Sequence, residues 1–389
     1  MFYNLAAPSW GEEELDAIKD VSSSGYFTMS ANVSSFESAF AKYHDLPFGV
    51  MVNSGSSANL ISVASLFFKK DNPLKRGDEV IVPAVSWATT YYPLQQYGLK
   101  LKILDIDLET LNIDINRLEE ALTPKTKMIV AVSILGNPAP LDIIKDFADA
   151  KGLYFMEDNC ESLDAELGGK KAGSFGDLST FSFFFSHHIS TMEGGMVLTK
   201  NRELYNLLLS LRAHGWTRDL PPESPIFDAR NDDFYEAYRF ILPGYNVRPL
   251  EFAGAIGLQQ LKKLPDMTKI RRKNLSMFQT LMGKNENFII QRENGKSSSF
   301  SFPIIVHPQK NICRDRVFEG LKKAQIGYRI ITGGNILRHD VSCFFDYETV
   351  GKLENANTAH DFGFFVGNHP TDLSPQLTRL AEVLEDVTR

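Results

Sequence analysis

The chain has 389 residues, of which 43% are hydrophobic and 23% are charged, so it is long enough to bury one large core and a second, smaller one. Its formal net charge of -7 provides no electrostatic basis for binding nucleic acid. No segment approaches the roughly 20 apolar residues that span a bilayer, and residues 1–11 lack the basic start and apolar stretch of a secretory signal. These properties predict a globular, cytoplasmic protein with no membrane or nucleic-acid partner.

The region from about Phe27 to Thr199 alternates between short apolar runs and helical stretches. The apolar runs predict buried strands, and the spacing of apolar residues between them predicts helices. The strands are expected at 48–52, 79–82, 101–104, 127–132 and 153–156, and the helices at 58–70, 89–95, 115–122 and 141–150. Such alternation builds a mostly parallel sheet with helices on both faces, because each crossover lays a helix back on the sheet. Ligands are then expected at the carboxyl ends of the strands.

The remainder of the chain has a different pattern. A loop at 221–233 and a turn at 243–246 precede a long helical stretch from about 249 to 282. Beyond it, residues 300–307 alternate like a strand and residues 313–324 resemble a helix. We predict an α/β fold with a large domain over 1–248 and a smaller C-terminal α+β domain over 249–389. The sequence has no low-complexity linker, so the two domains should pack closely.

The first motif is Asn-Ser-Gly-Ser-Ser-Ala-Asn at 53–59, between the first expected strand and the first expected helix. Gly55, Ser56 and Ser57 could form a cradle for a single phosphate, because small residues let backbone N–H groups approach an anion at a helix N-terminus. The motif is neither a dinucleotide fingerprint nor a Walker loop. A plain serine-rich helix cap is the alternative interpretation.

The second motif is Glu-Asp-Asn-Cys-Glu at 157–161, directly after the expected strand 153–156. Asp158 could be a solvated strand terminus. In a pyridine-cofactor enzyme, a carboxylate in this place keeps the pyridinium nitrogen protonated, which makes the ring an electron sink. Trp87 offers a flat apolar face that could stack on such a ring, or it is a core residue.

The third motif, at 181–195, is Phe-Ser-Phe-Phe-Phe-Ser-His-His-Ile-Ser-Thr-Met-Glu-Gly-Gly. It resembles the sugar aminotransferases of the fold-type-I, aspartate aminotransferase superfamily, whose corresponding stretch is roughly Ser-Phe-Tyr-Pro-x-Lys-Asn, followed by Gly-Gly. Counting from Ser182 places His187 at the position of the cofactor-binding lysine. No gap is needed, because Gly194 and Gly195 keep their distance from it.

The resemblance covers essentially the whole chain and implies pyridoxal phosphate (PLP) and its amine form (PMP) as cofactors. It also implies a homodimer with shared active sites, in which Asn246 reaches the cofactor phosphate bound to the neighbouring subunit. Glu161 stands where aminotransferases usually have glutamine. The implied cofactor-binding residues are Gly55, Ser56, Ser57, Trp87, Asp158, Glu161, Ser182 and Asn246.

Histidine in place of lysine changes the expected reaction. An imidazole, with a pKa near 6.5, can move protons at neutral pH, but it cannot form an imine with the cofactor. Within the family, one small branch carries this histidine, and the chain looks very like it at 82–87, 90–98, 212–218 and 366–369. The resemblance implies that His187 is catalytic in removing the C3 hydroxyl of a nucleotide-linked 4-keto-6-deoxy sugar, with L-glutamate as amino donor. His187, His214 and Tyr92 are candidate acids for the departing hydroxyl.

The cysteine content separates two chemistries. A related branch deoxygenates CDP-linked sugars with a cysteine-ligated iron-sulfur cluster. Cys160, Cys313 and Cys343 are too few and too widely spaced to form such a cluster or another thiolate metal site. A redox-neutral dehydratase without an iron-sulfur reductase and without a bound metal is therefore predicted.

The substrate contacts are less determined by the sequence. Arg218 and Arg248 could clamp a diphosphate or form interface salt bridges, and Ser186 and His214 are further candidates. The resemblance implies GDP as the nucleotide, while a six-carbon and a seven-carbon sugar remain open. The alternatives are a sugar aminotransferase that tolerates histidine and a non-catalytic nucleotide-sugar-binding protein.

Overall fold

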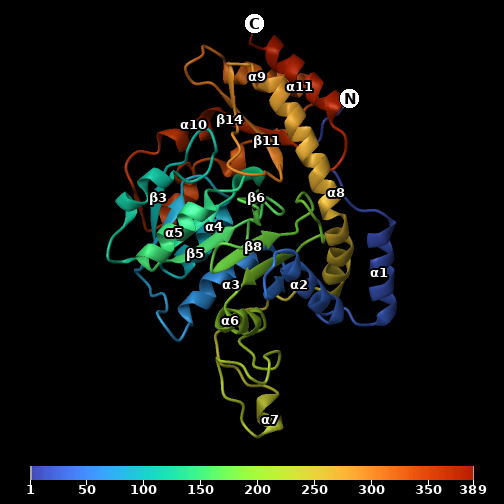
Figure 1. Cartoon of the computed structure of the whole chain (residues 1–389), viewed down its shortest axis with the longest axis vertical. Coiled ribbons are helices and arrows are strands. Elements are labelled where there is room, and N and C mark those ends of the chain that lie inside the picture. The colour runs from blue at the N-terminus through green and yellow to red at the C-terminus, as the bar shows by residue number, and fades with distance from the viewer. Residues whose placement is uncertain (1, 389) are drawn as a thin grey trace.

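Two sheets organise the computed structural model, which describes residues 2–388. The larger sheet has eight strands in the order β1-β9-β8-β5-β4-β2-β3-β13, and the smaller has four in the order β10-β11-β14-β12. Figure 1 shows the large sheet in the body of the molecule and the small sheet above it.

The strands are β1 (Phe48–Val52), β2 (Glu79–Pro83), β3 (Lys100–Leu104), β4 (Thr126–Val132), β5 (Tyr154–Asp158), β6 (Glu166–Leu167), β7 (Lys170–Lys171), β8 (Leu178–Ser182), β9 (Gly195–Thr199), β10 (Phe288–Ile290), β11 (Ser301–Val306), β12 (Tyr328–Arg329), β13 (Tyr347–Thr349) and β14 (Gly363–Gly367). The α-helices are α1 (Glu12–Ser24), α2 (Ala31–Tyr43), α3 (Gly55–Phe67), α4 (Ala88–Gln96), α5 (Leu141–Lys151), α6 (Arg202–Arg212), α7 (Asp233–Glu236), α8 (Glu251–Met282), α9 (Arg314–Lys323), α10 (Glu354–Phe362) and α11 (Ser374–Asp386). The five strands expected in the first half are confirmed as β1 to β5.

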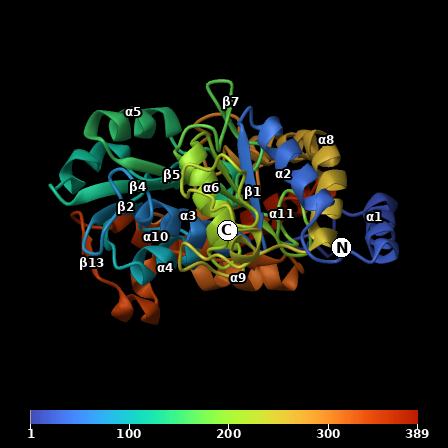
Figure 2. The same cartoon turned by 90° about the horizontal axis from the view of Figure 1, so that it is seen from below.

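The large sheet is parallel except for β9, which runs antiparallel to both of its neighbours. Strands β1 to β5 are largely buried, as the continuous apolar runs predicted, whereas the edge strand β13 is exposed. In β1, Val50 and Val52 pack in a core with α3 and α6, whereas Met51 packs on the other side with α2 and α8. Figure 2 shows α2 and α5 on one side of the large sheet and α4 on the other.

The α-helix expected at 115–122 is a wrong prediction. The segment instead forms two 3₁₀ turns, Ile115–Arg117 and Glu119–Ala121, in which Leu118 N bonds Ile115 O and Ala121 N bonds Leu118 O. The apolar residues of this segment recur every third position, which matches three residues per 3₁₀ turn. A spacing of three alone therefore did not discriminate between the two helix types.

The C-terminal segment contributes to both sheets. Helix α8 packs against α1 and α2 near its start and against α11 near its end, so it runs from one sheet to the other (Figure 1). Strand β13 lies between the small-sheet strands β12 and β14 in the sequence, but it pairs in parallel with β3 of the large sheet. There, Glu348 of β13 supplies a counter-ion at 3.0 Å for Lys102 of β3, whose side chain is almost completely buried. The segment 249–389 is thus tied to the large sheet at one edge.

The segment between α6 and α8 projects from the body of the molecule, with α7 at its tip (Figure 1). It carries the exposed aromatic residues Phe234, Tyr238 and Phe240, of which Phe234 is 93% exposed. None of the helices between residues 2 and 388 combines the length and the apolar character needed to cross a bilayer.

Helices α2 and α8 are joined by a buried carboxylate, which gives a test of the fold. Glu251 at the start of α8 accepts hydrogen bonds from the backbone N–H groups of Ser30 and Asn32, both at 2.6 Å, at the beginning of α2. Because a buried charged acceptor satisfies these otherwise free donors, we expect Glu251→Ala to lower the free energy of unfolding by about 1–3 kcal/mol. Chemical denaturation measures this change. The exposed Glu120→Gln serves as the control and should leave the transition nearly unchanged; equal effects of the two would contradict the capping role.

Candidate active site

The predicted site residues gather where two neighbouring strands end. Strands β5 and β8 are parallel, with Asp158 of β5 opposite Thr180 of β8. The N-terminus of α3 meets them there: a Cβ atom on Gly55 would lie 2.7 Å from Cβ of Ser182, so only glycine allows this approach. Gly55, Asp158 and Ser182 are therefore brought together at the carboxyl ends of the strands, as expected for this type of sheet.

The start of α3 combines a helix cap with an anion-binding geometry. Ser54 is the N-cap, and its side chain accepts a hydrogen bond from Ser57 N at 3.1 Å. The Ser57 hydroxyl donates to Oδ1 of Asn53 at 2.6 Å, and the Ser56 hydroxyl donates to Oγ1 of Thr89 at 3.0 Å. The capping interpretation is thus correct for Ser54. The first-turn N–H groups of Gly55 and Ser56 have no carbonyl acceptor within the helix and lie at its positive end, where a phosphate is favoured.

Asp158 is a buried carboxylate with a fixed orientation, which rules out the solvated strand terminus considered from the sequence. It is 4% exposed, and its Oδ2 accepts from Nδ2 of Asn59 at 2.9 Å and from the hydroxyl of Thr90 at 2.7 Å. Asn59 is oriented in turn by the hydroxyl of Thr180, which donates to its Oδ1 at 2.7 Å. The carboxylate is therefore preorganised as an acceptor at the end of β5.

Trp87 is not a core residue. It lies immediately before α4 and is 60% exposed, although tryptophan is usually highly buried. The hydrogen bond between Ser56 and Thr89 ties the start of α4 to the start of α3. Trp87 is therefore two residues from a side chain that contacts the predicted cradle, and its exposed indole offers a large apolar surface for stacking on a ring.

Glu161 connects two loops at the edge of the site. Its Oε2 accepts from Leu135 N at 2.9 Å, after β4, and from the Thr332 hydroxyl at 3.2 Å, after β12. Both donors belong to residues with positive φ, 54° at Leu135 and 39° at Thr332, a conformation that residues other than glycine rarely adopt. Burial and the nearby Asp158 charge raise the pKa of Glu161 to about 7, since backbone donation from Leu135 offsets only part of the desolvation.

His187 lies in the loop between β8 and β9. The loop is closed at its base by hydrogen bonds from Phe183 N to Gly194 O and from Thr191 N to Phe183 O. Burial, and next the positive charge of Arg271, lower the pKa of His187 to about 4. The imidazole is therefore neutral at physiological pH and has a lone pair to accept a proton, as a general base requires.

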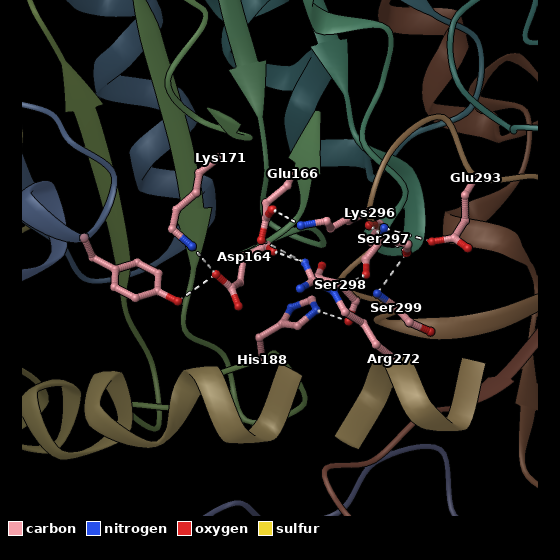
Figure 3. A network of polar contacts seen from close by, with 12 residues as sticks. Asp164, Glu166, Lys171, His188, Arg272, Glu293, Lys296, Ser297, Ser298 and Ser299 are labelled. Carbon is pink, nitrogen blue, oxygen red and sulfur yellow. Dashed lines mark hydrogen bonds and ion pairs between the residues drawn. The ribbon is translucent and has the colours of Figure 1, made fainter. Parts of the chain in front are cut away.

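His188 is more deeply buried than His187. It is 1% exposed, and Nε2 lies 3.3 Å from the backbone oxygen of Ser298. Figure 3 shows His188 pointing toward Ser298, at the border of a polar network that includes Arg272 and Asp164. In that network Arg272 donates to Ser297 O at 3.0 Å and to Asp164 O at 2.9 Å. His188 thus packs in the interior, while His187 is the half-buried member of the pair.

The remaining candidates lie beside the cradle or further out. Ser186 is half-buried next to His187, and Asn246 and His214 are exposed. Arg248 donates to Oδ1 of Asn246 at 3.0 Å, and this segment is joined to the cradle by Asn53 N, which donates to Val247 O at 3.0 Å. Arg218 lies on the projecting arm, the segment between α6 and α8, and its guanidinium carbon is 4.0 Å from the centre of the Trp216 ring. The segment with Asn246 and Arg248 therefore adjoins the residue that begins the cradle motif, whereas Arg218 contacts Trp216.

Several residues that organise the site were not singled out from the sequence. Asn59 and Thr90 orient Asp158, and their presence in the motif 53–59 and the segment 90–98 is the sequence signal that an amide and a hydroxyl donor were available to the carboxylate. Thr332, which donates to Glu161, and Arg271, whose charge lowers the pKa of His187, carry no local sign of these interactions. They belong to the C-terminal segment, far from the other site residues in the sequence, and only the folded structure brings them close.

The mixed, mostly parallel sheet and the adjoining α+β unit define a fold-type-I transferase. The model of the DegT/DnrJ/EryC1/StrS aminotransferase family matches residues 8–383. The chain therefore belongs to this family, which confirms the resemblance seen in the sequence.

Individual relatives are similar over nearly their whole length. The chain is 49% identical over 385 residues to the GDP-4-keto-6-deoxy-D-mannose 3-dehydratase of Yersinia pseudotuberculosis, with 98% of each covered. A solved structure of the Escherichia coli GDP-4-keto-6-deoxy-D-mannose-3-dehydratase with bound hydrated PLP is 48% identical, with a TM-score of 0.96, over 98% of this chain and 99% of that one. A structure of GDP-4-keto-6-deoxymannose-3-dehydratase with a trapped PLP-glutamate geminal diamine is 47% identical, with a TM-score of 0.96, over 98% and 100%.

The raised pKa of Glu161 predicts a pH-dependent effect of Glu161→Gln on stability. The folded chain holds the proton of Glu161 up to about pH 7, whereas the ordinary value is 4.5, so the stability that this group contributes is present below pH 4.5 and is lost as pH rises through 7. Glutamine keeps the acceptor and does not titrate. We expect the variant and the parent to match near pH 4 and the variant to be more stable at pH 8, by at most about 3 kcal/mol. Urea unfolding of the ligand-free chain at pH 4, 6 and 8 measures this, and a difference that does not vary with pH would contradict it.

Proposed function

We propose that the chain is a PLP/PMP-dependent C3 dehydratase. It would convert GDP-4-keto-6-deoxy-D-mannose and L-glutamate to GDP-4-keto-3,6-dideoxymannose, 2-oxoglutarate and ammonia. The similarity to full-length GDP-4-keto-6-deoxy-D-mannose 3-dehydratases supports this substrate. The reaction takes place in the cytoplasm and supplies a dideoxy sugar such as colitose for lipopolysaccharide or capsule.

The single observation that carries the proposal is the imidazole of His187 at the position of the family's lysine. A lysine amine would bind the cofactor covalently, and the imidazole of His187 cannot. It can accept and return a proton, and its low pKa makes the protonated ring a strong acid that can also serve the departing hydroxyl. Removing water from the sugar requires one proton to be taken up and one to be delivered to the leaving hydroxyl. It does not require a covalent bond between the cofactor and the protein.

The residues at the site fit the cofactor. The first turn of α3, with Gly55 and Ser56, would hold its phosphate, and Ser182 lies against Gly55 to add a hydroxyl. Asp158, held by two donors, would accept a hydrogen bond from the protonated ring nitrogen, and Trp87 would stack on the ring face. Glu161 would lie beside the ring through its place after β5. When bound, the cofactor supplies the amine and the electron sink of the reaction.

The protein then contributes position and proton transfer. His187 would take a proton from the amine-bearing carbon of the bound cofactor and return one to the leaving C3 hydroxyl. Noncovalent contacts with the cradle, Asp158 and Trp87 would retain the cofactor, so its affinity would depend on these residues rather than on residue 187. Arg248, beside the cradle, is the first candidate for the sugar diphosphate, and Arg218 on the projecting arm is the second.

Replacing His187 tests whether proton transfer and cofactor binding depend on different residues. We expect His187→Asn to bind PLP and PMP within about threefold of the parent affinity while dehydration falls at least 10³-fold, because the amide keeps the volume but transfers no proton. Absorbance titration with each cofactor gives the affinity. Incubation with glutamate and GDP-4-keto-6-deoxymannose, followed by mass analysis for the deoxygenated sugar, gives the activity.

The same experiment separates the alternatives. An aminated sugar from the parent chain would identify an aminotransferase, and cofactor binding without any turnover would identify a binding protein. Turnover of a GDP-linked 4-keto-6-deoxyheptose in preference to the hexose would change the substrate. Retained dehydration by His187→Asn would refute the role of the imidazole.

We further propose that the active form is a homodimer with shared sites. Phe184, Phe185 and Met192, around His187, are 44%, 48% and 50% exposed, and a second subunit would cover these large apolar side chains. The exposed aromatic residues of the arm that carries α7 would pack against the same subunit. Asn246 would then contribute to the phosphate site of the neighbouring chain.

A mixing experiment tests the shared site. Asn246→Ala and His187→Asn should each be inactive alone. If Asn246 serves the neighbour, half of the dimers in an equal mixture are mixed and each has one intact site, so about a quarter of the parent activity should return. If Asn246 serves its own chain, no mixed dimer has an intact site and no activity returns. Sedimentation velocity should give about twice the chain mass of 43.7 kDa, and a monomer would contradict the dimer.

A further inference from the structure

His187 lacks the hydrogen bond that commonly orients a histidine used in catalysis. In such sites a carboxylate or carbonyl usually binds the second ring nitrogen and fixes the ring. Here Nδ1 of His187 is buried, and among residues 2–388 it has no hydrogen-bond partner. Another interaction must therefore hold the imidazole in place.

Two aromatic rings contact it. The Phe300 ring lies 5.2 Å from the imidazole, centre to centre, with an angle of 72° between the planes, and the Phe184 ring lies 6.0 Å away at 88°. Both are edge-to-face arrangements. Phe184 is 44% exposed, whereas Phe300 is half-buried and also contacts His188 at 5.8 Å. The closer and better fixed of the two is thus Phe300.

The backbone around Phe300 is held from several directions. Phe300 N donates to Leu135 O at 3.0 Å, and Phe300 O accepts from Nη1 of Arg271 on α8 at 3.3 Å. The preceding residue, Ser299, has a φ of 48°, and Nδ2 of Asn368 donates to its backbone oxygen at 3.0 Å and to its hydroxyl at 2.9 Å. Figure 3 shows Ser297, Ser298 and Ser299 beside His188 and Arg272. The ring is therefore attached to a rigid support.

We propose that Phe300 is the positioning residue of His187: its ring, fixed by α8 and by the segment 297–299, orients the imidazole in place of a carboxylate. The kinetic part of this inference rests on the proposed function. A carboxylate at Nδ1 would stabilise the protonated ring and make it a weaker acid. An aromatic ring fixes the geometry without that effect, so one imidazole can both take up and return a proton.

Variants at position 300 separate orientation from simple burial. Phe300→Leu keeps an apolar side chain without the ring, and Phe300→Tyr keeps the ring. We expect Phe300→Leu and Phe300→Ala to lower kcat for dehydration at least tenfold with less than a threefold change in KM, because small displacements of a catalytic group slow proton transfer steeply. Phe300→Tyr should retain kcat within threefold of the parent.

The matched control is Phe302→Leu. Phe302 belongs to the same strand region, is fully buried and stacks on Phe278 in the core of the small sheet. It should lower the melting temperature at least as much as Phe300→Leu and leave kcat within twofold. If Phe302→Leu lowers kcat as much as Phe300→Leu at equal stability, the effect is structural and the positioning role is refuted.

A second measurement is independent of the reaction. In the ligand-free chain, the charged group that acts on the imidazole is Arg271 of α8, and it and the neighbouring His188 remain in every variant. Nuclear magnetic resonance of labelled histidine should show His187 titrating near pH 4 in the parent and in Phe300→Tyr, and closer to 6.5 in Phe300→Ala as water reaches the ring. Unchanged titration and ring order in Phe300→Ala would overturn the inference even if the proposed function holds.

Discussion

The arrangement of the site depends on the buried carboxylate of Asp158. One of its oxygens accepts hydrogen bonds from Asn59 of α3 and Thr90 of α4, so three elements are fixed to each other at one atom. A buried carboxylate without these donors would carry a large desolvation penalty, and the helices cannot move away without incurring it. The phosphate cradle at the start of α3 and the exposed Trp87 before α4 both take their places from this constraint.

Two pairs of adjacent, chemically similar residues have different functions because the backbone places their side chains in different environments. Glu157 and Asp158 point to opposite faces of β5: Glu157 is fully buried and accepts from the N–H groups of Gly173, Phe175 and Gly176, which shapes the loop before β8. The two histidines differ in a similar way: His187 is half-buried, whereas His188 is buried inside the protein. The chemistry of the site therefore follows from which of two adjacent side chains faces the ends of the strands.

Local patterns were sufficient for the parts of the fold that depend on neighbours in the chain. Strands β1 to β5 follow from apolar runs, and His187 from its register with Ser182 and the glycine pair. The 3₁₀ turns near Leu118 were missed because a spacing of three fits two kinds of helix over so few residues. Thr332 and Phe300 could not be found, since each meets its target, Glu161 or His187, from more than 100 positions away, where no sequence spacing encodes the contact. Strand β13 was missed for the same reason, because three exposed residues form no recognisable apolar run.

The return of β13 to the large sheet makes the chain difficult to divide. A fragment that ended near residue 248 would leave β3 as an open edge, ready to pair with another copy, and would leave the ammonium of Lys102 without its counter-ion Glu348. It would also remove α8 from the side of α2. Two regions that look separable along the sequence should therefore unfold together, and exchange of the C-terminal half between relatives would have to preserve a strand edge and its ion pair as one unit.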